Sequence, residues 1–251
     1  MQTHDFQTQL KNLGINTGDT VLMHSSMKAL KTDMTPEEFI REIIEAIGPD
    51  GTLLVPALTY SSVNTENPLF KAAETEPCIG LIPRTFFKMP GVVRSLHPTH
   101  SVCALGKLAG ELCSAHINDE TPVGPNSPFM KITKYGGKLL FIGEVVKSCT
   151  FMHGVEEAAG APYALMREYT DYTLVDTDGK IIKKKYIRHN FKGYTQEYQR
   201  IKDILPYPEI KTGKVGEADC YLIESAALLE KAVAKIRENP FYFVDTKDEP
   251  E

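Results

Sequence analysis

The chain lacks the features by which several classes of protein are recognised. Its five cysteines are an odd number and include no C-x-x-C pair, so neither a disulfide framework nor a cysteine zinc site is indicated. No apolar run is long enough to cross a bilayer, and the polar start does not resemble a signal peptide. The net charge of −5 argues against a general nucleic-acid binder, because phosphate contacts need a clustered basic surface. We therefore expect a cytoplasmic protein without nucleic-acid or membrane partners.

What the chain does have is enough apolar material for one large core. It has 251 residues, of which 42% are hydrophobic, and this length suits either one large domain or two small ones. No internal repeat, low-complexity tract or linker divides it. We predict a single domain over residues 1–251.

Strands and helices alternate along the sequence. Three apolar runs without polar alternation predict strands covered on both faces: DTVLMHSS, with its strand at residues 20–24, GTLLVPALTY, and GKLLFIGEVV from Gly137. TPEEFIREIIEAIG predicts a helix with a capping box of Thr35 and Glu38, and IESAALLEKAVAKIREN predicts a terminal helix. This order is typical of an α/β fold with a central mixed sheet covered by helices.

Two further segments depart from that alternation. YTLVDTDGKIIKKKYIRH has strand-like halves around Asp178-Gly179, which predicts an additional antiparallel β element in the C-terminal half. Residues 61–76 are polar and poor in periodicity. A long loop of this kind in a compact domain is usually a lid or a binding loop.

The segment CTFMHGVEEAAG has the strongest catalytic pattern. If it begins a helix after the strand of Phe141 and Ile142, His153 and Glu156 share a face. A carboxylate that bonds one imidazole nitrogen fixes the tautomer and leaves the other nitrogen free to accept a proton. Thr150 lies near the helix N-terminus, where backbone N–H groups favour developing negative charge. The spacing predicts a general base beside an oxyanion site.

Two other readings of the same residues stay open. Cys149 could be a nucleophile with His153 as its base, since a helix N-terminus lowers the pKa of a thiol. The second hypothesis is a metal site, which requires His97, His100, His116 and His153 to converge. It lacks an H-E-x-x-H spacing, and a His-x-x-His pair around a proline cannot place both rings on one helical face.

Three more segments offer polar contacts to a ligand. In SLHPTHS, Pro98 holds His97 out of helical geometry, so His97 and His100 can donate to a carbonyl or a phosphate. HSSMK leaves the first strand at its carboxyl end, the usual place for ligand contacts in an open α/β sheet. SPFMKI predicts a helix capped by Ser127, which is either plain structure or an anion contact.

These segments together resemble the aminoglycoside 3-N-acetyltransferase family. GDTVLMHSSMKAL, GPDGTLLVPALTY, GLIPRTFFKMPGVVRSLHPTHSVCALG, SPFMKI, GGKLLFIG and TFMHGVEEAAG follow one another in the family's order, nearly from end to end. The resemblance implies an acetyl-CoA donor, no metal, a role in antibiotic resistance, and direct transfer to the amine of an aminoglycoside or a related amino sugar. It leaves open a monomer or a homodimer.

The resemblance also implies roles for single residues. His153 corresponds to the catalytic histidine and Glu156 to its supporting carboxylate, while the oxyanion contact of Thr150 rests on its place near the helix N-terminus. Of the two histidines in SLHPTHS, we favour His97 as a catalytic donor because proline fixes its backbone. The coenzyme-binding parts correspond to Ser25, Ser26, Met27, Lys28, Thr99, His100, Ser101, Ser127 and Phe129.

Two departures from the family pattern concern the acceptor and the oxyanion contact. Cys149 stands where the family usually has asparagine. YIRHNF stands where enzymes that act on aminoglycosides tend to have an acidic cluster, and Arg188 would repel a polycation unless it lies on a solvated hairpin face. The remaining acidic candidates are Glu66, Glu74, Glu76, Asp119, Glu120 and Glu157.

Three alternative functions stay open. The acceptor could be a nucleotide-linked amino sugar, the protein could bind coenzyme A with little transfer, or the histidines could hold a metal and hydrolyse a substrate.

Overall fold

A computed structural model describes residues 3–247, and a sheet of seven strands runs through its centre. Its strands are β1 (Thr20–Ser25), β2 (Thr52–Pro56), β4 (Val93–Arg94), β5 (Val102–Gly106), β6 (Lys138–Ile142), β10 (Ile210–Val215) and β11 (Ala218–Glu224). The spatial order is β10-β11-β6-β1-β2-β5-β4. β1 is parallel to both β6 and β2, and the outer pairs are antiparallel. The sheet is mixed, with a parallel centre.

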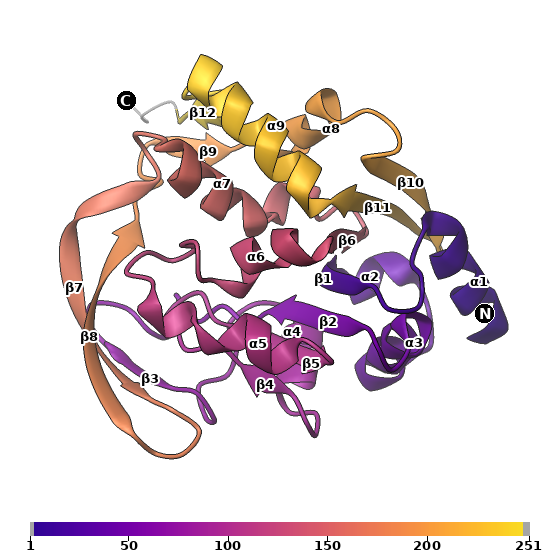
Figure 1. Ribbon diagram of the computed structural model, residues 1–251, viewed down its shortest axis with the longest axis horizontal. Helices are drawn as coiled ribbons and strands as arrows, with labels where there is room; N and C mark the ends of the chain where they lie inside the picture. The colour runs from indigo at the N-terminus through magenta and orange to yellow at the C-terminus, as the bar shows by residue number, and fades with distance from the viewer. Residues whose placement is uncertain (1–2, 248–251) are drawn as a thin grey trace.

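Helices cover both faces of this sheet (Figure 1). One face carries α1 (Thr3–Leu13), α3 (Pro36–Ile47) and α4 (Leu81–Phe87), and the other carries α5 (Ala109–Ser114), α6 (Pro128–Lys131), α7 (Phe151–Ala159) and α9 (Ser225–Glu238). Two single-turn helices, α2 (Met27–Leu30) and α8 (Ile201–Ile204), lie in connections. No helix within residues 3–247 combines the length and the apolar character that crossing a bilayer requires.

The apolar pattern of β1 shows why the central strands have no polar face. Val21 and Met23 pack with the helices of one face, while Leu22 packs with those of the other. Both directions are buried, so alternation would place polar groups in a core. The strand runs into the sheet as predicted and ends at Ser25, one residue beyond the predicted boundary.

Two helices begin as their sequences predict. Thr35 accepts a bond from the backbone N–H of Glu38, whose carboxylate bonds back to Thr35, and this capping box starts α3. Ser127 accepts from the N–H of Met130 and starts α6 with a proline in the first turn.

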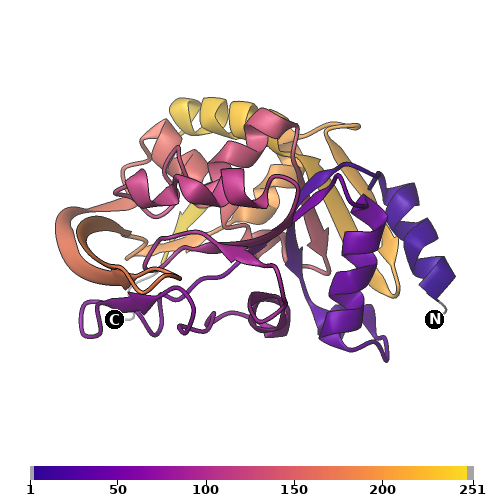
Figure 2. The ribbon, with the colours of Figure 1, turned by 60° about the horizontal axis from the view of Figure 1, so that its bottom comes forward.

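A curved hairpin forms a second sheet at one side of the molecule. β7 (Leu165–Val175) and β8 (Ile181–His189) pair antiparallel around the predicted Asp178-Gly179 turn, where Gly179 has a φ of +82°. β3 (Leu69–Lys71) pairs parallel with β7. The hairpin lies at the end of the molecule away from α1 (Figure 1 and Figure 2). β9 (Tyr194–Gln196) and β12 (Val244–Thr246) form a separate pair.

The predicted α/β class, with a helix-covered mixed sheet and an extra antiparallel element, is confirmed. The reading of residues 61–76 as an irregular loop is wrong in part, because β3 lies within it. Its strand is three residues long with only Phe70 buried, which is too short to produce an alternating pattern. The single domain over residues 1–251 stays a prediction.

Candidate active site

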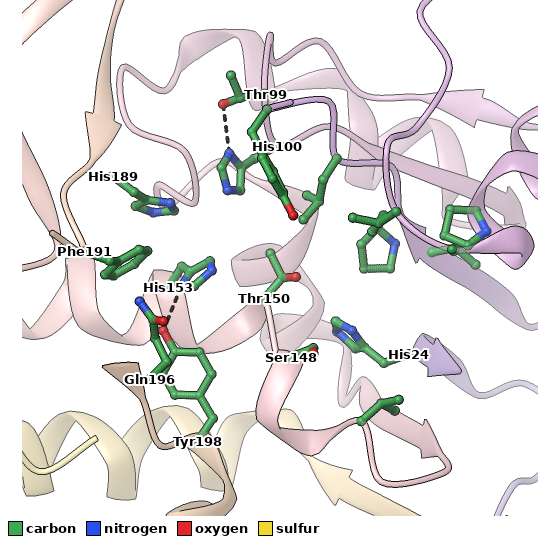
Figure 3. Close-up of a pocket in the computed structure, with 18 of the residues that line it drawn as sticks. His24, Thr99, His100, Ser148, Thr150, His153, His189, Phe191, Gln196 and Tyr198 are labelled. Carbon is green, nitrogen blue, oxygen red and sulfur yellow. Dashed lines mark hydrogen bonds between the residues drawn. The ribbon is translucent and has the colours of Figure 1, made fainter. Parts of the chain in front are cut away.

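A cavity of about 620 Å³ lies at the carboxyl ends of the three parallel strands (Figure 3). Its floor comes from the ends of β1 and β2 and from residues 145–150, which follow β6. The opposite wall comes from the loop after β2 and from the hairpin and β9 region. Carboxyl ends of parallel strands are where ligands bind in open α/β sheets, and this volume suits a small molecule.

α7 presents His153 to this cavity from its first turn. The helix starts after Thr150, whose side chain is buried, lines the cavity and makes no capping bond. Next to His153, a Cβ on Gly154 would lie 2.3 Å from the Met130 sulfur and 2.7 Å from a Val123 methyl carbon. Only glycine therefore lets α7 pack this closely on α6, and that packing sets the position of His153.

The orienting group of His153 is a pair of residues, Tyr198 and Glu156. The Tyr198 hydroxyl donates to Glu156 Oε2 at 2.8 Å and lies 2.8 Å from His153 Nδ1, while Nδ1 and Oε2 are 3.4 Å apart. The single phenol proton goes to the carboxylate, so the phenol oxygen accepts from Nδ1–H. His153 then keeps Nε2 as a bare acceptor on the cavity side.

Burial makes this arrangement rigid and keeps the phenol protonated. Glu156 is fully buried and accepts a second phenol bond, from Tyr163 at 3.0 Å to Oε1. Burial and the adjacent Glu156 carboxylate raise the pKa of Tyr198 well above its usual value. The predicted pair of His153 and Glu156 is present, and the Tyr198 hydroxyl contacts both side chains.

Three histidines face one another across the cavity. The rings of His153 and His189 are 4.6 Å apart, and those of His100 and His189 are 4.7 Å apart. One nitrogen of each lies within 4.8 Å of the others, a spacing that could hold a metal ion. Thr99 Oγ1 bonds His100 Nδ1 at 2.8 Å, and Glu157 Oε1 lies 3.2 Å from His189 Nε2. Burial lowers the pKa of His100 and of His189 well below the usual value, so both are neutral at pH 7.

His97 lies behind His100 and does not line the cavity. Its Nδ1 accepts the backbone N–H groups of Thr99 and His100, at 3.2 and 3.0 Å. Its ring is 1% exposed and packs against His116 at 4.9 Å. The geometry gives His97 a positioning role, in which it holds the backbone that carries His100. The predicted catalytic role of His97 stays a prediction.

The residues expected to bind the coenzyme divide into two groups. Ser25, Thr99 and His100 line the cavity. Outside the lining, Ser101 bonds the Ala57 carbonyl and Ser127 caps α6. Also outside the lining are Ser26, Met27, Lys28 and the fully buried Phe129.

The acidic candidates do not form a cavity wall. No aspartate or glutamate is among the described residues that line the cavity. Glu74 and Glu76 pair with Lys71 and Lys88 on the surface. Arg188, by contrast, does line the cavity, as do its neighbours His189 and Phe191.

Several lining residues have no role predicted from the sequence, although His24 and His189 lie in the segments HSSMK and YIRHNF. Tyr198 follows β9 and is 45 positions from His153, and His189 comes from the end of β8. His24 stacks on Phe141 at 5.1 Å, and burial lowers its pKa to about 4. Only the tertiary fold brings these rings together, so spacing along the chain could not reveal them.

Cys149 is fully buried, and burial raises the pKa of its thiol to about 12. A nucleophile needs the thiolate, which is scarce at pH 7 under these conditions. We expect Cys149→Ala to keep kcat within about 3-fold of the parent chain. Thiol release from acetyl-CoA measures this, and a loss of turnover with retained folding would restore Cys149 as a nucleophile.

Known proteins resemble this chain over most of its length. The sequence model of one family, described as aminoglycoside 3-N-acetyltransferase, matches residues 22–237. Aminoglycoside N(3)-acetyltransferase VII of Streptomyces paromomycinus is 27% identical over an alignment of 259 positions, which covers 91% of this chain and 89% of that protein.

Solved structures show the same similarity. A mutant of aminoglycoside acetyltransferase AAC(3)-IVa, in complex with a gentamicin, matches with a TM-score of 0.81 at 26% identity, over 97% of this chain and 92% of that one. AAC-IIIb in a binary complex with CoASH matches with a TM-score of 0.82 over 100% and 99% of the two chains. At 20% identity, the second likeness concerns the fold alone.

Proposed function

The chain belongs to the aminoglycoside 3-N-acetyltransferase family, and we propose that it transfers the acetyl group of acetyl-CoA to an amine of an aminoglycoside or a related amino sugar. The predicted family and its acyltransferase class are confirmed. The observation that supports the reaction is the His153–Tyr198–Glu156 arrangement at a cavity of ligand size.

In the proposed reaction, the acceptor nitrogen attacks the thioester carbonyl carbon, the C–S bond breaks, and an amide and the coenzyme A thiol form. His153 Nε2 accepts the proton that the attacking amine loses, and the imidazolium then returns it to the departing thiolate, which leaves as the coenzyme A thiol. The bonds from Nδ1 to Tyr198 and onward to Glu156 stabilise the imidazolium that results. The Thr150 hydroxyl, buried at the cavity and free of a capping bond, steadies the oxyanion.

The coenzyme is proposed to enter from the side of β1. Ser25 lies at the end of that strand, and Lys147 follows β6 on the same side of the cavity as Ser148. An exposed lysine suits the coenzyme phosphates, which it can bind as a point charge. Figure 3 shows Ser148 and His24 on one side of Thr150 and His153, with His189 and Phe191 on the other. The second side is left for the acceptor.

Measurement of coenzyme A thiol release tests this function. The purified protein is mixed with acetyl-CoA and, in turn, with aminoglycosides, simple amino sugars and nucleotide-linked amino sugars. Acceptor-dependent release supports the proposal. Tight acetyl-CoA binding without release from any amine would instead identify a coenzyme-binding relative with little transferase activity.

The trio of His100, His153 and His189 favours a metal hydrolase as the second candidate. We expect transfer to need no metal, so EDTA should leave kcat unchanged. Added Zn²⁺ should inhibit, because it competes for the Nε2 lone pair of His153, and His189→Gln should raise the zinc concentration required. Stoichiometric zinc in the purified protein, lost together with turnover on chelation, would contradict the transferase reading.

A further inference from the structure

The cavity carries positive formal charge and no negative charge on its lining. Lys147 and Arg188 are the charged side chains among the described lining residues. Burial lowers the pKa values of His24, His100 and His189, so these rings add no cation at pH 7. A polycationic ligand would therefore meet like charge without a compensating carboxylate.

The two carboxylates nearest the histidines are already used by the protein. Glu156 accepts two phenol bonds, from Tyr163 and Tyr198. Glu157 Oε1 accepts the backbone N–H of Val123 and lies 3.2 Å from His189. Both side chains are at most 7% exposed, and neither lines the cavity. Glu157 Oε2 is buried without a hydrogen-bond partner among the described residues, and burial raises the pKa of Glu157 to about 7, which weakens it as a counter-ion for an ammonium group.

Arg188 is held so that part of its guanidinium is available. Its Nε donates to Thr170 Oγ1 at 3.1 Å, across the hairpin. Within residues 3–247 it makes no ion pair, and the two terminal nitrogens have no protein acceptor. It precedes His189, whose ring lies 4.6 Å from that of His153. A cation without a counter-ion thus lies on the acceptor side of the proposed base.

A second donor lies on the strand that Arg188 contacts. Tyr172 follows Thr170 on the same face of β7, lines the cavity and is 2% exposed. Its hydroxyl is buried with no hydrogen-bond partner among the described residues. Burial raises the pKa of this phenol, and the charge of Arg188 opposes that shift. Buried hydroxyls are normally satisfied, so this orphan, two residues from the Thr170 that Arg188 contacts, indicates an absent acceptor group.

We propose that the acceptor is an amine that also carries an anionic group, a phosphate or a carboxylate, and that Arg188 and Tyr172 bind that group. The proposal rests on the acetyl transfer described above and names the class of its acceptor. The anionic group is bound on the hairpin side, the amine faces His153 Nε2, and Lys147 is left to the coenzyme. Aminoglycosides, which carry several ammonium groups and no anion, are poor acceptors on this account.

Matched acceptors test the proposal through kcat/KM for thiol release. Glucosamine, which carries one amine and no anionic group, is the reference acceptor. Glucosamine 6-phosphate adds a phosphate, muramic acid adds a carboxylate, UDP-glucosamine adds a diphosphate, and gentamicin adds further ammonium groups. We expect at least one anionic amine to exceed glucosamine by about 10- to 100-fold, since charge-assisted bonds are the stronger class. Gentamicin should fall below glucosamine.

Variants of Arg188 separate binding of the anion from general damage. Arg188→Gln should remove the advantage of the preferred anionic amine, so that its kcat/KM falls to that of glucosamine, and the loss should be much larger for the anionic amine than for glucosamine. Arg188→Lys should keep part of the advantage, and Tyr172→Phe should lower it less than Arg188→Gln. Arg167→Gln is the control, because Arg167 is exposed on β7 and lies outside the cavity lining. This variant should change kcat/KM neither for the anionic amine nor for glucosamine.

The outcomes distinguish this proposal from the proposed function. Transfer that favours gentamicin, or an Arg188→Gln variant that lowers kcat/KM equally for glucosamine and its phosphate, overturns the anionic acceptor and leaves acetyl transfer intact. Absence of thiol release with every amine overturns the acetyl transfer itself. An Arg188→Gln variant that loses kcat/KM selectively for the anionic amine supports both the acetyl transfer and the anionic acceptor.

Discussion

Replacing His153 with alanine is expected to lower kcat by about 10²–10⁴-fold, the contribution typical of a general base. The side chain is 17% exposed and reaches the cavity, so its removal takes away the proton acceptor without opening the core. The variant should keep its thermal midpoint to within a few degrees and should bind acetyl-CoA as the parent chain does.

Steady-state thiol release at saturating acetyl-CoA measures this effect, and circular dichroism checks folding. A control is available in Cys149→Ala, which changes a residue of the same segment that does not reach the cavity. If His153→Ala turned over at a near-normal rate, another group would have to accept the proton, and the assignment would be wrong.

Glu156→Gln is expected to lower kcat by about 10²–10³-fold, with KM for acetyl-CoA changed by less than about 3-fold. The substitution keeps the volume of a fully buried side chain. It removes the negative charge that stabilises the imidazolium and introduces an amide donor that disturbs the two phenol bonds. The Asp→Asn change at the orienting carboxylate of a Ser-His-Asp triad lowers kcat by about 10⁴-fold, and the Tyr198 phenol between Glu156 and the ring makes the expected loss here smaller.

Tyr198→Phe is the matched variant for Glu156→Gln, and its effect should be the smaller. Without the phenol, His153 Nδ1 can bond Glu156 Oε2 directly, because these atoms are only 3.4 Å apart. We expect a loss in kcat of about 10-fold or less. A Glu156→Gln variant that raises KM and leaves kcat unchanged would show that Glu156 serves binding or stability and not the orientation of the base.

The parts of the site that could be predicted from the sequence are those set by local geometry. His153 and Glu156 are one helical turn apart, and the helix could be placed because an apolar strand precedes it. The capping box of α3 and the turn at Gly179 are local in the same sense. In each case, a few adjacent residues determine the structure.

The parts that could not be predicted depend on long-range packing. Tyr198 enters the site because the segment after β9 folds back against α7, and nothing in its neighbourhood indicates a catalytic contact. Arg188 could equally have faced solvent, and its place in the cavity lining depends on how the hairpin packs against the rest of the fold. Pro98 does fix the backbone of His97, but the resulting turn directs His100 to the cavity instead.

The central claim is that His153 carries its proton on Nδ1 and offers a bare Nε2 to the acceptor. ¹⁵N NMR of the protein labelled at histidine, with His153 assigned by comparison with His153→Ala, measures this tautomer directly. The account predicts that neutral His153 is protonated at Nδ1, and that Glu156→Gln lowers the fraction of this tautomer. A neutral His153 protonated at Nε2 would contradict the account, because that nitrogen could not accept a proton from the amine.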